Sequence, residues 1–169
     1  MPIRDAVPDD AESIRAVHRA SITGLGPQAY DDEQVAAWAR GCDDADYRAA
    51  IQSPELDYVV AERDGGIIGF GSLRDPAPDH YDDAVDVEIT AVYVHPSVAR
   101  EGVGNRITDE LEARARNADA TVLGLTASLP AVPFYASRGY ERVKERTHEF
   151  SADAGTGVTG TVVEMRRLL

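Results

Sequence analysis

The chain has 169 residues, of which 30 are acidic and 17 are basic, and its formal net charge is −13. This length is enough for one domain with its own hydrophobic core. The acidic balance argues against a nucleic-acid-binding surface, and no stretch approaches the roughly 18 apolar residues of a membrane span. Cys42 is the only cysteine, which argues against a disulfide framework or a thiolate metal cluster. We therefore expect one cytoplasmic domain over residues 1–169, with no nucleic acid, membrane or metal partner.

Two explanations of the acidity stay open. Lys144 is the only lysine, and a strongly acidic, highly solvated surface is typical of adaptation to salt. A cleft that receives cationic substrates would also be acidic. In either case, an anionic ligand has to be held locally, by a helix end, against the field of the whole protein.

The first fifty residues predict one short strand followed by helices. Apolar residues recur at helical spacing after Pro8, and glycines and proline interrupt the pattern near residue 26. The predicted elements are a strand over residues 3–6 and helices over residues 11–25, 30–40 (ended by Gly41) and 43–52.

The next segment predicts a hairpin and then a loop. Residues 57–63 and 67–73 are rich in β-branched and aromatic residues, and Asp64-Gly65-Gly66 between them is a strong turn signal. Residues 74–84 carry two prolines and four aspartates. We expect a solvated surface loop there.

Residues 87–104 predict a strand, a tight turn and the start of a helix. The strand is apolar from Val87 to Val94 and stops where Pro96 cannot continue a ladder. Gly102 and Gly104 lead into a helix over residues 102–117 with apolar residues at steps of four. The first N–H groups of a helix have no intrahelical partner and lie at the positive end of its dipole. The turn is therefore a candidate site for a phosphate or diphosphate.

The spacing argues against two common nucleotide-binding motifs. A dinucleotide fingerprint requires a third glycine, where this chain has Ile107. A P-loop requires Gly-Lys-Ser/Thr, which is absent from the sequence.

The last fifty residues predict three strands and a short helix. Two prolines suit the entry and first turn of a helix, and Gly139 suits its left-handed end. The predicted elements are strands over residues 120–126, 140–150 and 161–169, the helix before Gly139, and a glycine- and threonine-rich loop over residues 155–160.

Two motifs in this order resemble the signatures of the GNAT superfamily of N-acetyltransferases. The first is Val-x-Pro, a short loop and Arg/Gln-x-x-Gly-x-Gly/Ala. The second is a small helix of the form Ala-x-x-Phe/Leu-Tyr-x-x-x-Gly-Phe/Tyr. The matching residues are Val94, Pro96, Gly102 and Gly104 for the first motif, and Ala131, Phe134, Tyr135, Gly139 and Tyr140 for the second.

Two positions depart from the family pattern. Ala99 stands where the first motif usually has Arg or Gln, and Arg100 follows one place later. Ser128 stands where many members have an asparagine. These departures motivate an alternative function, an acyl-CoA-binding sensor or interaction module that does not catalyse transfer.

The resemblance implies an α/β (α+β) fold: a mixed, mostly antiparallel sheet of about seven strands, flanked by helices and splayed beside the strand that ends at Val94. It also implies an enzyme that transfers the acetyl group of acetyl-CoA to a primary amine of a small molecule or peptide, without a metal, and as a homodimer in some members. The implied cofactor-binding residues are Val92, Tyr93, Val94, Arg100, Glu101, Gly102, Val103, Gly104, Asn105 and Ser128.

The same resemblance implies roles for four further side chains. Tyr135 occupies the position of the general acid that protonates the departing thiolate, and packing is the alternative role for it. Glu88 lies on the central strand, where some members place a glutamate that works as base through water; a structural ion pair is the alternative. Tyr30 and Trp38 are candidates for lining the acceptor pocket, although aromatic residues at helical spacing are more often core. The sequence leaves the identity of the acceptor amine open.

Overall fold

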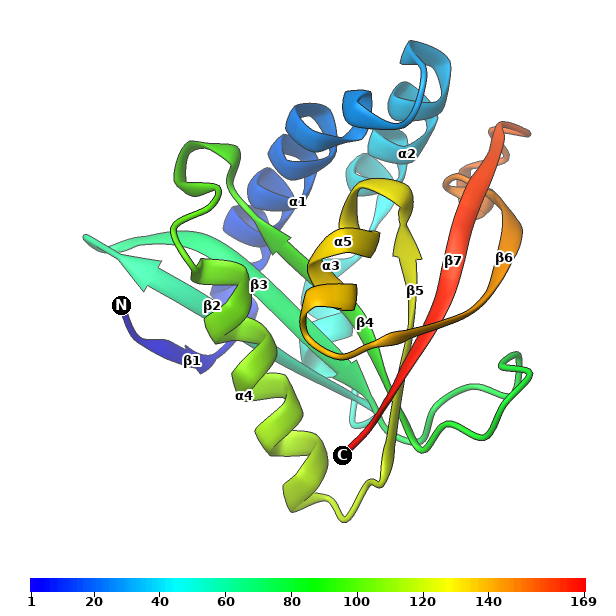
Figure 1. Ribbon diagram of the computed structural model, residues 1–169. Coiled ribbons are helices and arrows are strands. Elements are labelled where there is room, and N and C mark those ends of the chain that lie inside the picture. The colour runs from blue at the N-terminus through cyan, green and yellow to red at the C-terminus, as the bar shows by residue number, and fades with distance from the viewer.

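A seven-stranded sheet organises the computed structural model, which describes residues 1–169 (Figure 1). The strand order is β1-β2-β3-β4-β5-β7-β6, and all neighbours are antiparallel except β4 and β5. This is the mixed, mostly antiparallel sheet that the sequence predicts. The strands are β1 (Ile3–Asp5), β2 (Leu56–Arg63), β3 (Gly66–Arg74), β4 (Val87–Val94), β5 (Val122–Ser128), β6 (Glu141–Glu149) and β7 (Thr159–Leu168).

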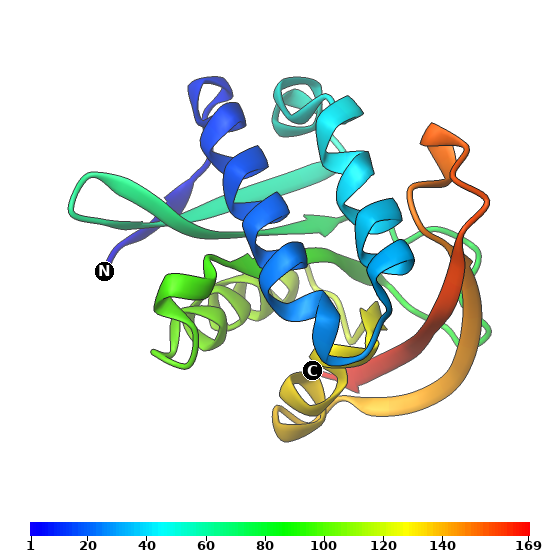
Figure 2. The same cartoon turned by 90° about the horizontal axis from the view of Figure 1, so that it is seen from above.

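Helices cover both faces of the sheet. Figure 2 shows α1 and α2 on one side and α4 on the other. Buried side chains of α1 and α3 pack against β2 and β3, whereas those of α4 and α5 pack on the opposite face. The helices are α1 (Ala11–Leu25), α2 (Asp32–Asp44), α3 (Tyr47–Gln52), α4 (Val103–Asn117) and α5 (Val132–Ser137). None of them has the length and apolar character that crossing a bilayer requires.

Helix α4 lies close to the sheet because glycines of β3 face it. Ile107 and Leu111 of α4 are fully buried, as their spacing in the sequence predicts. A Cβ on Gly71 would lie 2.6 Å from Ile107 Cγ2 and 2.9 Å from Leu111 Cδ1. Because these glycines of β3 carry no side chain, α4 can pack close to the sheet.

The two central strands pair over a short distance and then separate. β4 and β5 are in register from Val87 opposite Leu123 to Ile89 opposite Leu125, and no pairing follows. β4 nevertheless continues to Val94, held on its other edge by β3. Figure 1 shows the two strands diverging towards their C-terminal ends. The splayed sheet implied by the GNAT resemblance is therefore confirmed.

Several predicted boundaries are wrong, and Gly41 is the most instructive case. It lies inside α2 and does not end the helix. A Cβ there would lie 2.5 Å from Ser151 Oγ, so the missing side chain leaves room for the turn between β6 and β7. The next residue, Cys42, is 1% exposed, and burial raises the pKa of its thiol.

Other differences lie at element ends. The helix predicted over residues 43–52 begins at Tyr47, because the Asp46 carboxylate caps it by accepting from the Ala49 N–H. The strand predicted over residues 120–126 runs two residues later, as Val122–Ser128. The loop predicted over residues 155–160 is shorter, since β7 already begins at Thr159.

We predict that Gly71→Ala lowers the free energy of unfolding by about 1–3 kcal/mol, because the new methyl group overpacks the contact with α4. Urea denaturation would measure the change. Gly66→Ala is the matched control in the same strand, since a Cβ there would meet nothing closer than Arg63 O at 3.7 Å. Equal stability of the two variants would contradict this account of the α4 contact.

Candidate functional site

The turn between β4 and α4 presents unbonded backbone N–H groups. Gly102 is the N-cap of α4 with a left-handed φ of 85°, and no side chain caps the helix. A side chain at this φ is strained, and Gly102 has nothing within 4 Å of its missing Cβ. The N–H groups of residues 100–105 donate to no acceptor within the protein. The turn thus has the free amides and the dipole end that a diphosphate requires.

Side chains of this turn are fastened to neighbouring elements. Arg63, at the end of β2, bonds to Glu101 Oε1 at 2.9 Å. Arg138, just after α5, donates to Asn105 Oδ1 at 2.9 Å. These contacts use side chains and leave the amides of the turn free.

The edge of β4 that faces β5 presents further backbone groups. The His95 N–H donates to Ile68 O of β3 at 2.8 Å. Because bonding alternates along an antiparallel ladder, Tyr93 directs its backbone N–H and C=O at β3. Val92 and Val94 direct theirs at the opposite edge, beyond the last β4–β5 pair. Of the three predicted β4 residues, Val92 and Val94 therefore offer free backbone, and Tyr93 does not.

Tyr135 lies on α5 in the core beside the splayed strands. Its side chain is largely buried, with the residue 6% exposed, and its ring packs against Phe134 and Tyr140. Burial, and next the proximity of Tyr93, raise the pKa of the Tyr135 phenol far above its usual range. The phenol therefore keeps its proton at neutral pH, as a proton donor to a leaving group must.

The face of the sheet covered by α1 and α2 carries an aromatic cluster around Tyr93. The Tyr93 ring lies 4.2 Å from the His18 ring of α1 and 6.4 Å from the Trp38 ring of α2. Trp38 is half-buried here, so its predicted place beside an acceptor pocket is consistent with the structure. Thr90 of β4 and Thr126 of β5 are exposed on this face, although they belong to central strands. We use the name acceptor groove for the exposed surface at these two threonines, where β4 and β5 part.

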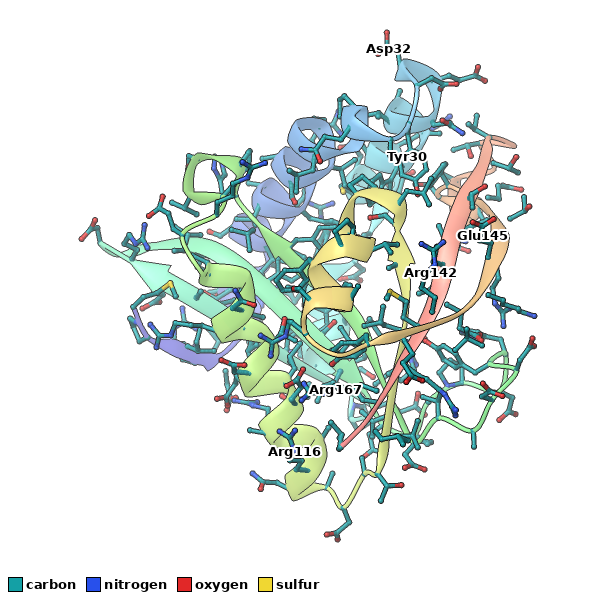
Figure 3. All side chains as sticks on the ribbon, in the orientation of Figure 1. Tyr30, Asp32, Arg116, Arg142, Glu145 and Arg167 are labelled. Atoms are coloured by element: carbon teal, nitrogen blue, oxygen red, sulfur yellow. The ribbon has the colours of Figure 1, made fainter.

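Tyr30 does not line this groove, and that prediction is wrong. The residue is 6% exposed, its hydroxyl donates to Thr161 O at 2.7 Å, and it accepts from the Leu129 N–H at 2.9 Å. Figure 3 shows Tyr30 between α2 and the upper ends of β5 and β7. Tyr30 instead fixes the turn that follows Ser128, which ends β5 half-buried beside the splay.

Glu88 of β4 lies at the base of the groove, and its side chain is 12% exposed. The Tyr81 hydroxyl donates a hydrogen bond to its carboxylate, and His80 Nε2 lies 3.7 Å away. The structure thus gives Glu88 neither a lysine nor an arginine partner. The ion-pair alternative reduces to the histidine contact.

Two groups in this region were not among the predicted site residues. His18 bonds through Nδ1 to Tyr47 OH at 2.7 Å, and its burial lowers the pKa of the imidazole to about 4. The other group is Tyr81, from the segment expected to be solvated. The adjacent pair His80-Tyr81 in an otherwise acidic loop was the signal available in the sequence.

Comparison with known proteins decides the family. The profile described as "Acetyltransferase (GNAT) domain" matches residues 27–152. The chain belongs to the GNAT family. It is therefore an acyltransferase by family, with an α/β fold and the signatures of N-acetyltransferases in place.

Relatives of this GNAT chain cover nearly all of its length. A crystal structure of a GCN5-related N-acetyltransferase from Rhodopseudomonas palustris, also described as "Aminotransferase, Class-II", is 30% identical, with a TM-score of 0.85 over 99% of this chain and 95% of that one. The uncharacterised N-acetyltransferase YafP of Escherichia coli (strain K12) is 25% identical over 87% of this chain and 85% of its own. The PaiA N-acetyltransferase of Thermoplasma acidophilum, solved in complex with coenzyme A, shares the fold with a TM-score of 0.75 at 19% identity, over 99% and 98% of the two chains.

We predict that the GNAT chain loses stability between pH 7 and pH 5 partly through His18. The folded pKa of about 4 lies below the 6.5 that is usual for a solvent-exposed imidazole, so the unfolded state binds more protons in this window. The contribution of His18 is present above pH 6.5 and falls by on the order of 2 kcal/mol by pH 5. Urea denaturation across this range should show a shallower pH dependence for His18→Gln. An unchanged slope in that variant would contradict burial of a neutral imidazole.

Proposed function

We propose that this acyltransferase transfers the acetyl group of acetyl-CoA to a primary amine of a small molecule, and that residues 1–169 form one catalytic domain. The observation that carries the proposal is the free backbone along one path. Unbonded amides at residues 100–105 lead to the unpaired edge of β4 at Val92 and Val94.

The residues fit acetyl-CoA as donor substrate. The amides of residues 100–105 would hold its diphosphate at the positive end of α4. The Val92 and Val94 edge would pair with the amide-containing arm of the coenzyme, and Ser128 lies across the splay from it. Backbone N–H groups suit a protein of net charge −13, because they supply positive potential without basic side chains.

Two side chains would carry the proton transfers. Glu88, directly or through water, would accept a proton from the incoming ammonium, which frees the amine for attack on the thioester carbonyl. The Val92 N–H would polarise that carbonyl. Tyr135 would give its phenolic proton to the departing sulfur and regain a proton from the nitrogen as the amide forms. The ammonium thus loses two protons: one reaches the sulfur by way of Tyr135, and one leaves through Glu88 to solvent, so that the products are the amide, the free thiol and one proton.

The structure favours a small acceptor over a polypeptide, because the turn between β6 and β7 closes on α2. Ser151 Oγ accepts from the Gly41 N–H at 2.9 Å and donates to Trp38 O at 3.0 Å. Gln34 of α2 donates to Thr159 O at 3.0 Å. These bonds join α2 to the turn between β6 and β7, so an extended chain could not pass between them.

We predict that the protein releases free thiol from acetyl-CoA in the presence of small primary amines, and that Tyr135→Phe lowers kcat by about a hundredfold, the usual order for loss of a general acid. Spectrophotometric thiol release would follow turnover. The affinity for acetyl-CoA should stay unchanged, since the ring remains. Full activity of Tyr135→Phe would remove the phenol from the mechanism.

The acceptor panel should pair each free amine with a peptide that carries the same amino group at its N-terminus. Faster turnover of the peptides than of the matching free amines would refute the proposal that the acceptor is a small molecule. Binding of coenzyme A without turnover of any amine would favour the non-catalytic sensor, the alternative that Ala99 and Ser128 motivate.

We predict that Gly102→Ala weakens coenzyme A binding about tenfold. An alanine at φ 85° costs about 1–2 kcal/mol, and relaxation of that strain would turn the amides of the loop away from the ligand. Gly65→Ala is the matched control, because Gly65 also has a positive φ, of 77°, with nothing within 4 Å, but lies in the β2–β3 turn. Titration calorimetry should show weaker binding for Gly102→Ala alone. Equal affinities in both variants would contradict the loop's role.

A further inference from the structure

The segment between β3 and β4, residues 75–86, is a mostly exposed loop, as predicted, and it is also bonded to β5, β6 and β7. Asp86 Oδ2 accepts from the N–H groups of Thr121 and Val122 at 2.9 Å each. Arg146 of β6 donates to His80 O at 2.6 Å, and Lys144 of β6 pairs with Asp82. Figure 1 shows this segment beside the ends of β5, β6 and β7. It is therefore fastened to these strands at its C-terminal end and in its middle.

Tyr81 reaches from this segment to the point where the central strands part. Its hydroxyl donates to the Glu88 carboxylate. The Thr126 hydroxyl lies beside the same phenol and lowers its pKa slightly, against a larger opposite effect of burial. Glu88 belongs to the short paired stretch of β4, and Thr126 is the first residue of β5 beyond the last pair. The phenol thus bridges the two strands at the vertex of the splay.

Glu88 depends on this one donor. The Tyr81 hydroxyl provides the single hydrogen bond to its carboxylate, apart from the contact with His80 Nε2 at 3.7 Å. Burying a carboxylate is unfavourable unless a donor compensates for lost water. Burial, and next the bond to Glu88, raise the pKa of Tyr81 far above its usual range, so the phenol remains a donor wherever the enzyme is folded.

The other charges around Glu88 are already paired. Arg74 of β3 stands opposite Glu88 in the ladder, but its guanidinium bonds to Glu55 at 3.3 Å. Glu164 of β7 lies on the far side of Tyr81 and bonds to Arg146 at 2.6 Å. Arg146 and Lys144 both contact Asp82. No cation among them is free to replace the phenol.

We propose that Tyr81 is a positioning residue of the transfer reaction: its phenol bonds to the Glu88 carboxylate and fixes the orientation of that carboxylate towards the acceptor groove. This inference rests on the proposed function, in which Glu88 accepts the proton of the ammonium. Segment 75–86 then holds the phenol in place, because its bonds to β6 restrict the position of Tyr81.

The test is the pH dependence of kcat/KM for one amine, compared between the wild-type enzyme and Tyr81→Phe. A hydrogen bond to a carboxylate favours its ionised form, so its loss should move the acidic limb of the profile to higher pH, by about one unit. The rate near neutral pH should fall about tenfold, while the KM for acetyl-CoA stays the same. Use of the same amine cancels its own ionisation from the comparison.

Tyr140→Phe is the matched control. Tyr140 also donates from a phenol to a buried glutamate, Glu112, at 3.0 Å, but on the α4 face of the sheet. It should lose a comparable amount of thermal stability without any movement of the acidic limb. A limb that moves equally in both variants would show a general structural effect and overturn the inference.

Glu88→Gln separates the inference from the function on which it rests. If Glu88→Gln is slow and adding Tyr81→Phe slows it no further, the two residues act as one unit, and the inference is supported. If Glu88→Gln is slow but Tyr81→Phe leaves the limb in place, the inference alone fails. If Glu88→Gln keeps the wild-type rate, Glu88 is not the base, and both the proposed proton transfer and the role of Tyr81 are overturned.

Discussion

The separation of β4 from β5 is the constraint on which the rest of the structure depends. Two parallel strands that begin in register from Val87 to Ile89 would bury more backbone by pairing to their ends. Beyond Ile89 each strand keeps only the partner on its other side: β4 pairs with β3 as far as Val94, and β5 pairs with β7 as far as Ser128. Backbone polar groups left without a strand partner are costly unless another group or water bonds to them. The opening is thus a ready acceptor of an amide-containing chain.

The electrostatic potential of the protein has opposite signs at long range and within the β4–α4 turn. At long range the net charge of −13 repels an anion, whereas within the β4–α4 turn the helix end and the amides attract one. Arg63, which reaches the turn from the end of β2, is paired with the acidic Glu101. Selectivity for a diphosphate therefore comes from geometry, that is, from several N–H groups directed at one point.

The sequence predicted most of the fold and the β4–α4 turn to which the proposed function assigns the donor, because these depend on local chemistry. Proline ends β4, glycines permit the turn before α4, and a four-residue spacing buries Ile107 and Leu111; each is readable from neighbouring residues. The acceptor half depends on long-range contacts. Tyr30 was a candidate for the acceptor pocket, but its hydroxyl bonds to Leu129 and Thr161, which lie 99 and 131 residues away in the chain.

The same limit explains why Tyr81 was missed and why Gly41 was misread. An acidic, proline-containing segment has the composition of a loop, and nothing in its local sequence shows that Lys144 and Arg146 will hold it. A glycine near a helix end is usually a stop signal. At position 41 it serves as space for Ser151, a partner 110 residues away.

The burial of the Cys42 thiol bears on free coenzyme A, the thiol product of the proposed reaction. Free coenzyme A can exchange with accessible protein thiols to form mixed disulfides, and such exchange needs an exposed thiolate. Cys42 is 1% exposed, and burial keeps its proton in place. In the folded protein Cys42 is therefore inert towards the free coenzyme A of the proposed reaction, and in the native state it does not react with thiol-specific dyes.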